Sequence, residues 1–189
     1  MNAHKLLFLN IFFATACSGC ASVAPLSDES ADFQLRGKLG VVEGGESFSA
    51  RFLWRQHGQA FTIDLWGPLG QGRVRLIGDD QRIAVLDGNG AIVTEGGHGD
   101  VMFAHLGWTL PLAVLRDWVL GVPGDGVLSG QSRYDDAGHL VAFEQLDWAV
   151  VFAQHREVAG SEGTRWLPRK ITARRGDYQV RLVISEWRI

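Results

Sequence analysis

The stretch that decides the fold spans residues 48–66 and reads FSARFLWRQHGQAFTIDLW. Apolar and polar residues alternate on both sides of a His-Gly pair at 57–58. This period-two alternation predicts two strands, each with one buried and one solvated face, joined in an antiparallel hairpin. The apolar face of the hairpin consists of Phe48, Ala50, Phe52, Trp54, Phe61, Ile63 and Leu65.

The same alternation continues on either side of this hairpin. It begins at Phe33, returns at 74–76 and 83–93, and indicates three further strands at 139–154, 165–174 and 177–188. Glycine-rich segments separate the runs, and 24 of the 189 residues are glycine. One-sided alternation with short connections predicts an antiparallel sheet of at least eight strands.

Two short helices interrupt the strand pattern, at 100–106 and 111–120. The second has Pro111 in its first turn and Gly121 just past its end, as is typical of helices. Leu112, Leu115 and Val119 form its apolar stripe, with Trp118 beside them. Two such helices are a thin cover for a wide apolar sheet. We therefore expect a mainly β fold, an incomplete antiparallel β-barrel in which short helices cover an apolar cavity, with a fully packed barrel as the alternative.

Composition limits the possible functions. A chain of 189 residues with 46% hydrophobic residues fits one globular domain, and its net charge of −3 argues against a broad nucleic-acid surface. The six histidines have no metal-ligand spacing, and no phosphate-binding loop or nucleophile elbow is present. We expect no enzyme activity, no metal and no cofactor.

The N-terminus reads as a targeting segment. Residues 6–16, LLFLNIFFATA, form an apolar run of eleven residues after Lys5, which is shorter than the roughly 20 that a membrane-spanning helix needs. This pattern is typical of a secretory leader. The next residues, Cys17-Ser18-Gly19-Cys20-Ala21, resemble the lipobox of bacterial lipoproteins.

The lipobox resemblance implies a signal peptide at 1–19, a lipidated N-terminus and tether at 20–32 with acylation of Cys20, and a folded domain at 33–189. Ala21, rather than Asp, follows the lipidated cysteine, which by the same resemblance places the anchor in an outer membrane. Two alternatives remain open. Cleavage before Cys17 would make Cys17 the acylated residue, and a cut after Ala16 would make an ordinary soluble secreted protein.

The connection at 66–72 reads WGPLGQG and is unusually apolar for a hairpin turn. Glycine and proline are ordinary turn residues, but Trp66 and Leu69 bring apolar groups to a tip that is normally polar. In one interpretation Leu69 packs back against the sheet. In the other, Pro68 stiffens an apolar finger that enters a membrane, with Trp66 at the headgroup boundary.

An ordered set of segments resembles the LolB family of outer-membrane lipoprotein receptors of Gram-negative bacteria. The segments are FQLRGKL at 33–39, ARFLW at 50–54, PLG at 68–70, LPLAVLRDW at 110–118, GVP at 121–123, and the final strand closing on Trp187. The resemblance covers nearly the whole chain after the lipobox. It implies an incomplete antiparallel β-barrel with a helical lid over an apolar cavity.

The resemblance further implies a receptor that takes lipoproteins from the periplasmic carrier LolA, holds their acyl chains and inserts them into the outer membrane. The partners would be a LolA-type carrier, lipoprotein acyl chains and the outer membrane. The protein would be a monomer, held on the outer membrane by its lipid anchor and facing the periplasm. Face alternation and the helix stripe assign the acyl cavity to Phe48, Phe52, Trp54, Phe61, Ile63, Leu65, Leu115 and Trp118. The loop residues Trp66, Pro68 and Leu69 would insert into the membrane.

Two alternatives to the receptor are a lipid-binding lipoprotein and a scaffold for envelope assembly with a filled core. A lipid hydrolase would need a nucleophile beside a base, and the sequence offers no such pair. The cavity assignment depends on register, because a slip of one residue would exchange it for the opposite face.

Overall fold

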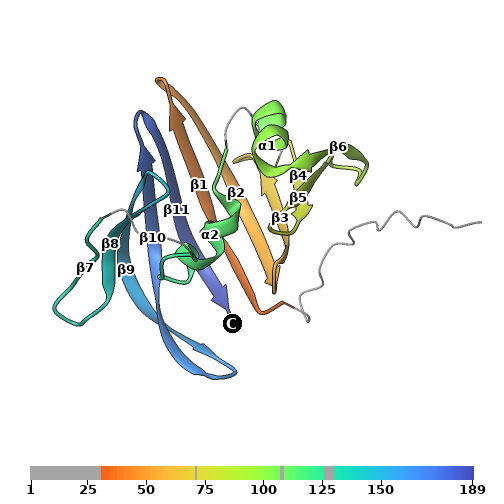
Figure 1. The fold of residues 1–189 in the computed structure, drawn as a ribbon. Helices are drawn as coiled ribbons and strands as arrows, with labels where there is room; N and C mark the ends of the chain where they lie inside the picture. Colours follow the sequence, from red (N-terminus) through yellow and green to blue (C-terminus); the bar gives the residue numbers. More distant parts are fainter. Residues whose placement is uncertain (1–30, 71, 107–108, 126–129) are drawn as a thin grey trace, which may run out of the picture.

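The computed structural model describes residues 31–70, 72–106, 109–125 and 130–189. The expected signal peptide, Cys17, Cys20 and most of the tether lie outside these residues. Figure 1 shows a single strongly curved sheet with two helices lying inside its curve. The expectation of a mainly β, unclosed antiparallel barrel with short helices is confirmed.

In the described part of the chain, eleven strands form one sheet in the order β6-β5-β4-β3-β2-β1-β11-β10-β9-β8-β7. Every neighbouring pair is antiparallel. The strands are β1 (Phe33–Glu43), β2 (Glu46–His57), β3 (Ala60–Trp66), β4 (Val74–Gly78), β5 (Arg82–Leu86), β6 (Ile92–Gly97), β7 (Arg133–Tyr134), β8 (Leu140–Gln145), β9 (Trp148–Gly160), β10 (Gly163–Arg175) and β11 (Tyr178–Arg188).

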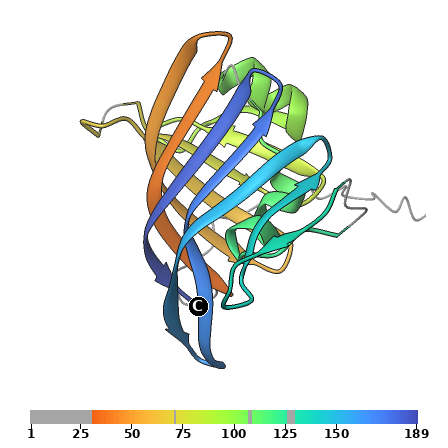
Figure 2. The same ribbon diagram turned by 90° about the vertical axis from the view of Figure 1, so that its left-hand side faces the viewer.

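The strand order explains why a lid exists. Strands β6 and β7 follow each other along the chain but form the two opposite ends of the sheet, so the chain between them has to pass from one end to the other. Helices α1 (His98–Leu106) and α2 (Leu112–Val119) lie in this connection. Both were predicted to within two residues at each end, and Figure 2 shows them on the inner side of the sheet.

One predicted strand is in fact two. The segment 139–154, predicted as a single strand, folds as the β8–β9 hairpin with Leu146 and Asp147 at its turn. Both residues have positive φ, 51° and 62°, as a two-residue hairpin turn of the primed type requires. Neither is glycine or asparagine, the residues that normally signal such a turn. The alternation of apolar and polar residues therefore gives no sign that a strand ends there.

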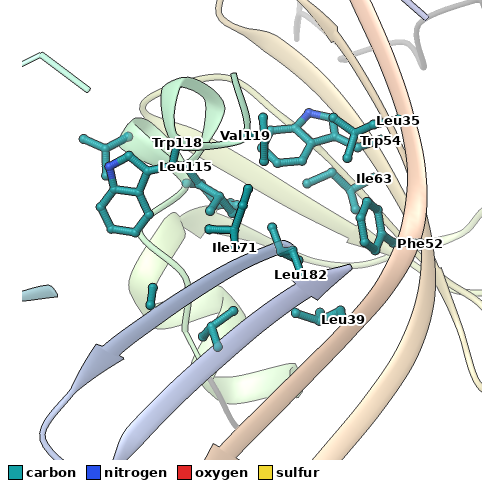
Figure 3. Packing of buried hydrophobic residues seen from close by; sticks show 14 of the residues in the cluster. Leu35, Leu39, Phe52, Trp54, Ile63, Leu115, Trp118, Val119, Ile171 and Leu182 are labelled. Carbon is teal, nitrogen blue, oxygen red and sulfur yellow. The ribbon is translucent and has the colours of Figure 1, made fainter. Parts of the chain in front are cut away.

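The core lies between the concave face of the sheet and α2. Leu112, Leu115, Trp118 and Val119 of α2 are buried against inward-facing side chains of the strands. Figure 3 shows Phe52, Ile63 and Leu182 from the sheet and Leu115 from α2 pointing into the same interior. The amphipathic stripe of the helix thus closes the open side of the half-barrel.

Candidate functional site

An apolar cavity lies under the N-terminal half of α2. It is bounded by α2, the segment before it, and strands β1, β2, β3, β4 and β11. Its lining is entirely apolar: Leu39, Phe52, Trp54, Ile63, Leu65, Leu76, Leu110, Leu112, Leu115 and Leu182. The indole Nε1 of Trp54 is already bonded, since it donates to Gln56 Oε1 at 2.8 Å. The cavity therefore offers contact area without directional bonds.

The cavity is small, at about 20 Å³. A single water needs roughly 10–15 Å³ measured in this way, whereas pockets for small ligands span about 300–1,000 Å³. The structure is thus a closed form in which the lid fills most of the space that the curved sheet encloses.

Five of the eight residues expected in the cavity line it: Phe52, Trp54, Ile63, Leu65 and Leu115. Five further residues line the cavity, and the sequence did not assign them to it. Leu39, Leu76 and Leu182 lie in segments that the alternation predicts as strands. Leu112 belongs to the predicted helix stripe. Leu110 precedes α2 and carried no periodic signal.

Three expected residues lie elsewhere. Phe61 is buried at the edge of α1, where its ring meets His98 edge-on at 6.2 Å. Trp118 is fully buried beyond the cavity, between Phe143 and Trp148. Phe48 does not belong to the cavity wall, because its side chain is 40% exposed.

Phe48 lies close to the β1–β2 turn. It shares the inner face of β2 with Phe52, but it pairs with Val41 close to the turn at 44–45. The β1–β2 hairpin extends past the helices at this end (Figure 2). Alternation predicts the inner face for Phe48, which it shares with its buried neighbour Val41, but it does not predict the partial exposure of Phe48.

The C-terminal end of α2 is firmly held. The Trp118 indole donates to Gln145 Oε1 at 2.9 Å, and the same oxygen accepts from the backbone N–H of Gly124 at 3.0 Å. The Gln145 amide nitrogen then donates to the Gly124 carbonyl at 2.7 Å. These buried bonds fix the end of α2, and the chain that follows it, on the β8–β9 hairpin.

The Tyr178 side chain holds the segment that leads into α2. The Tyr178 hydroxyl of β11 bonds to both backbone groups of Thr109. Burial raises the pKa of Tyr178 to about 12. A polar outer pocket of about 270 Å³, lined by Glu43, Phe103, Thr109, Arg175, Asp177 and Tyr178, adjoins this contact.

The β3–β4 loop carries an exposed leucine. The Gly70 N–H donates to the Gly67 carbonyl at 2.9 Å, which closes a turn with Pro68 in its second position and Leu69 in its third. Leu69 is 87% exposed, so of its two expected placements the structure has the projecting one. In Figure 2 the loop projects to the left, on the side of the sheet away from the helices. Trp66, at its base, is half-buried.

A buried charge cluster fixes the base of this loop. Asp64 of β3 is fully buried and accepts from Arg75 at 2.8 Å, and from Arg55 and Arg73 at 3.3 Å each. Burial alone would raise the pKa of the Asp64 carboxyl, but the hydrogen bonds and charges of Arg75 and Arg73 outweigh it and lower the pKa. Arg73 and Arg75 follow the loop and Asp64 precedes it, so these bonds join its two ends.

No group of histidine, cysteine and acidic side chains that could hold a metal ion occurs among the described residues. Within the same part of the chain, neither helix is long and apolar enough to cross a membrane.

Comparison with known proteins adds to this geometry. Residues 31–187 match the family model described as "Outer membrane lipoprotein LolB". An outer-membrane lipoprotein LolB of Halorhodospira halophila is 31% identical over 194 residues, covering 96% of this chain and 94% of the relative. Another from Stutzerimonas stutzeri is 34% identical over 156 residues, covering 82% of this chain and 73% of the relative.

Proposed function

Because the chain belongs to the LolB family of outer-membrane lipoproteins, we propose that it accepts lipoproteins from a LolA-type periplasmic carrier, holds their acyl chains between α2 and the sheet, and inserts them into the outer membrane. In this proposal Cys20 carries the lipid anchor, and the folded domain faces the periplasm as a monomer. The protein is a receptor and not an enzyme.

The observation that carries the proposal is the wholly apolar lining of the interior under α2. Acyl chains gain about 0.8 kcal/mol for each CH₂ group removed from water, and this gain needs no directional bond. A lining of leucine, isoleucine and aromatic side chains accepts any such chain, whatever protein is attached to it. Recognition by the lipid alone suits a receptor that serves many lipoproteins.

The closed cavity requires the lid to move before an acyl chain enters. Leu110, Leu112 and Leu115 form the lid's share of the lining, and all three lie toward the N-terminal end of α2. Trp118 holds the other end through Gln145. We therefore expect the N-terminal end of α2, with the segment before it, to swing outward about the Trp118 end.

In this proposal the β3–β4 loop delivers the lipoprotein to the membrane. Leu69 stands on a proline-stiffened turn whose base is joined by the Asp64 cluster. Its exposed side chain would enter the hydrocarbon, and Trp66 would lie near the headgroups, where tryptophan is enriched. No nucleotide is needed if acyl affinity rises from the carrier to the receptor and then to the bilayer.

Transfer from a loaded carrier tests the proposal directly. Every described strand, helix and buried side chain lies between residues 31 and 189, so a chain that starts at residue 20 with Cys20→Ala keeps the folded part. This chain is mixed with a LolA-type carrier holding a radiolabelled lipoprotein, and the two proteins are separated. The label should move to the chain. Label that stays on a carrier competent toward another LolB protein would overturn the proposal.

The small volume of the cavity favours a second candidate, a scaffold for envelope assembly with a permanently filled core. The same experiment separates the two, because a scaffold would take no label. A lipid-binding protein that acts without a carrier would bind a fluorescent fatty acid but leave the lipoprotein on its carrier.

A further inference from the structure

The outer face of the sheet is strongly basic although the whole chain has a net charge of −3. One row of cross-strand neighbours runs over five strands, from Lys170 on β10 through Val183 on β11, Lys38 on β1 and Arg51 on β2 to Trp66 on β3. Each of the five has a buried neighbour next to it in its strand, so the five side chains share the outer face. These neighbours are Ile171, Leu182, Leu39, Ala50 and Leu65. We call these five residues the basic row.

The cations in the basic row have no ion-pair partner in the part of the chain that the structure describes. Lys38 and Arg51 are direct cross-strand neighbours and both are exposed. Among the described residues, no acidic side chain forms an ion pair with Lys38, Arg51 or Lys170. Like charges directly opposite each other destabilise a sheet, and an anion placed between them would remove that cost.

The next row of the same face adds positive charge. Asp64 pairs in register with Arg75 and also receives bonds from Arg55 and Arg73. One carboxylate therefore faces three guanidinium groups. The Arg73 side chain is more than half exposed, and Arg73 follows Leu69 by four residues in the chain.

The direction in which the apolar loop projects indicates which surface the outer face contacts. The basic row ends at Trp66, the last residue before the loop, and the loop projects on the side of the sheet opposite the helices (Figure 2). A bilayer that Leu69 enters therefore lies on the side that carries Lys38 and Arg51. The charge that complements them there is the phosphate of lipid headgroups.

We propose that the outer face of β1, β2 and β11 binds the headgroups of anionic phospholipids, so that the basic row rests on the membrane surface while Leu69 enters the hydrocarbon. This inference rests on the membrane-delivery part of the proposed function and adds the lipid class that the face selects. Each lysine or arginine close to an anionic surface contributes about a fivefold gain in affinity. The gain falls off within about 8–10 Å at physiological salt, so only cations on this face contribute.

Vesicle binding tests the inference without carrier or cargo. The chain starting at residue 20 with Cys20→Ala is sedimented with vesicles of phosphatidylcholine, and with vesicles in which a third of the lipid is phosphatidylglycerol. We expect tighter binding to the anionic vesicles and a loss of the difference at high salt. Lys38→Gln/Arg51→Gln should weaken binding to the anionic vesicles about 25-fold and leave binding to phosphatidylcholine unchanged.

Arg133→Gln/Arg165→Gln is the matched control. Both arginines are exposed and, among the described residues, without an ion pair, and they lie on the edge strand β7 and at the far end of β10. The control should bind anionic vesicles within about twofold of the parent, and circular dichroism verifies that both variants are folded.

Equal binding of the parent to both vesicle types, or equal loss in the two double variants, would overturn the inference. So would a Lys38→Gln/Arg51→Gln chain that keeps its vesicle binding but no longer accepts a lipoprotein, because the face would then serve an acidic carrier protein. If the parent chain does not bind anionic vesicles but still accepts the lipoprotein from its carrier, the inference is wrong and the proposed receptor function is unaffected.

Discussion

The Tyr178 hydroxyl bonds to both backbone polar groups of Thr109: it donates to the carbonyl oxygen at 2.7 Å and accepts from the N–H at 3.0 Å. Tyr178 begins β11, and Thr109 belongs to the segment that leads into α2. The two residues are 69 positions apart in the chain. Two hydrogen bonds from one buried side chain thus fasten the segment that leads into α2, which moves in the proposed mechanism.

Tyr178→Phe should loosen the lid. Loss of two hydrogen bonds should lower the free energy of unfolding by about 1–2 kcal/mol and speed the uptake of a fluorescent fatty acid. Amide hydrogen exchange should increase at Leu110 and Leu112. Tyr134→Phe is the control, because Tyr134 is 63% exposed and should change neither quantity. A less stable Tyr178→Phe chain with unchanged uptake would show that the contact supports the fold without gating the cavity.

The same hydroxyl predicts a loss of stability at alkaline pH. Burial raises the pKa of Tyr178 from 10.0 to about 12 in the folded chain. A group with a raised folded-state pKa contributes stability that is complete below the unfolded value and is lost as pH rises through the folded value. Urea unfolding should therefore show stability falling between pH 10 and 12, and Tyr178→Phe should reduce this fall. An equal fall in both chains would mean that other groups cause it.

Asp64→Asn should destabilise the base of the loop. Removal of a fully buried carboxylate leaves three arginines facing one another without a counter-charge, at a cost of about 3 kcal/mol in urea unfolding. Because the pKa of Asp64 is lowered from 3.8, its contribution is complete above that value and is lost as pH falls through the lower folded value. Asp64→Asn should therefore flatten the acid limb of the stability profile.

Glu186→Gln is the control for this prediction. Glu186 also lies near two arginines, Arg36 at 3.9 Å and Arg188 at 3.5 Å, but its side chain is 47% exposed. Exposed ion pairs contribute about 0–1 kcal/mol, so stability should hardly change. Equal effects of the two substitutions would contradict the view that burial gives Asp64 its role.

Local patterns in the sequence were sufficient to predict the sheet and the lid. One-sided alternation identifies the inner faces of β2, β3 and β11, and Pro111 with Gly121 marks the two ends of α2. Leu69 could be singled out because an apolar residue beside Pro68 has no shelter. The face of each residue and the limits of the helices follow from such short-range rules.

What the sequence leaves open depends on contacts distant in the chain. Alternation assigns Phe48 a face but cannot show that the hairpin extends beyond the helices. The volume of the cavity depends on how closely α2 packs against the concave face of the sheet. The bond of Tyr178 to Thr109 has no local pattern at all, because it forms only when β11 and the lid meet in space.

The hidden β8–β9 turn gives a prediction of its own. Leu146 and Asp147 occupy left-handed conformations. Such a conformation costs a residue like leucine about 1–2 kcal/mol, whereas aspartate and asparagine tolerate it better and glycine adopts it freely. Leu146→Asn/Asp147→Gly supplies the preferred residues, and should raise the free energy of unfolding by about 1–2 kcal/mol. Leu146→Asn alone should give part of this gain. A decrease would mean that the exposed Leu146 side chain contributes contacts that outweigh the strain.

Leu69→Glu separates acceptance of a lipoprotein from its delivery. Leu69 is 87% exposed, so the substitution should leave folding and uptake from the carrier intact. A charge moved into hydrocarbon costs about 3 kcal/mol, so transfer of radiolabelled lipoprotein to vesicles should slow about 100-fold. Leu146→Glu is the matched control, because Leu146 is also an exposed leucine in a hairpin turn, and it should deliver normally. Normal delivery by Leu69→Glu would remove the loop from the mechanism, whereas equal failure of both chains would point to surface charge in general as the cause.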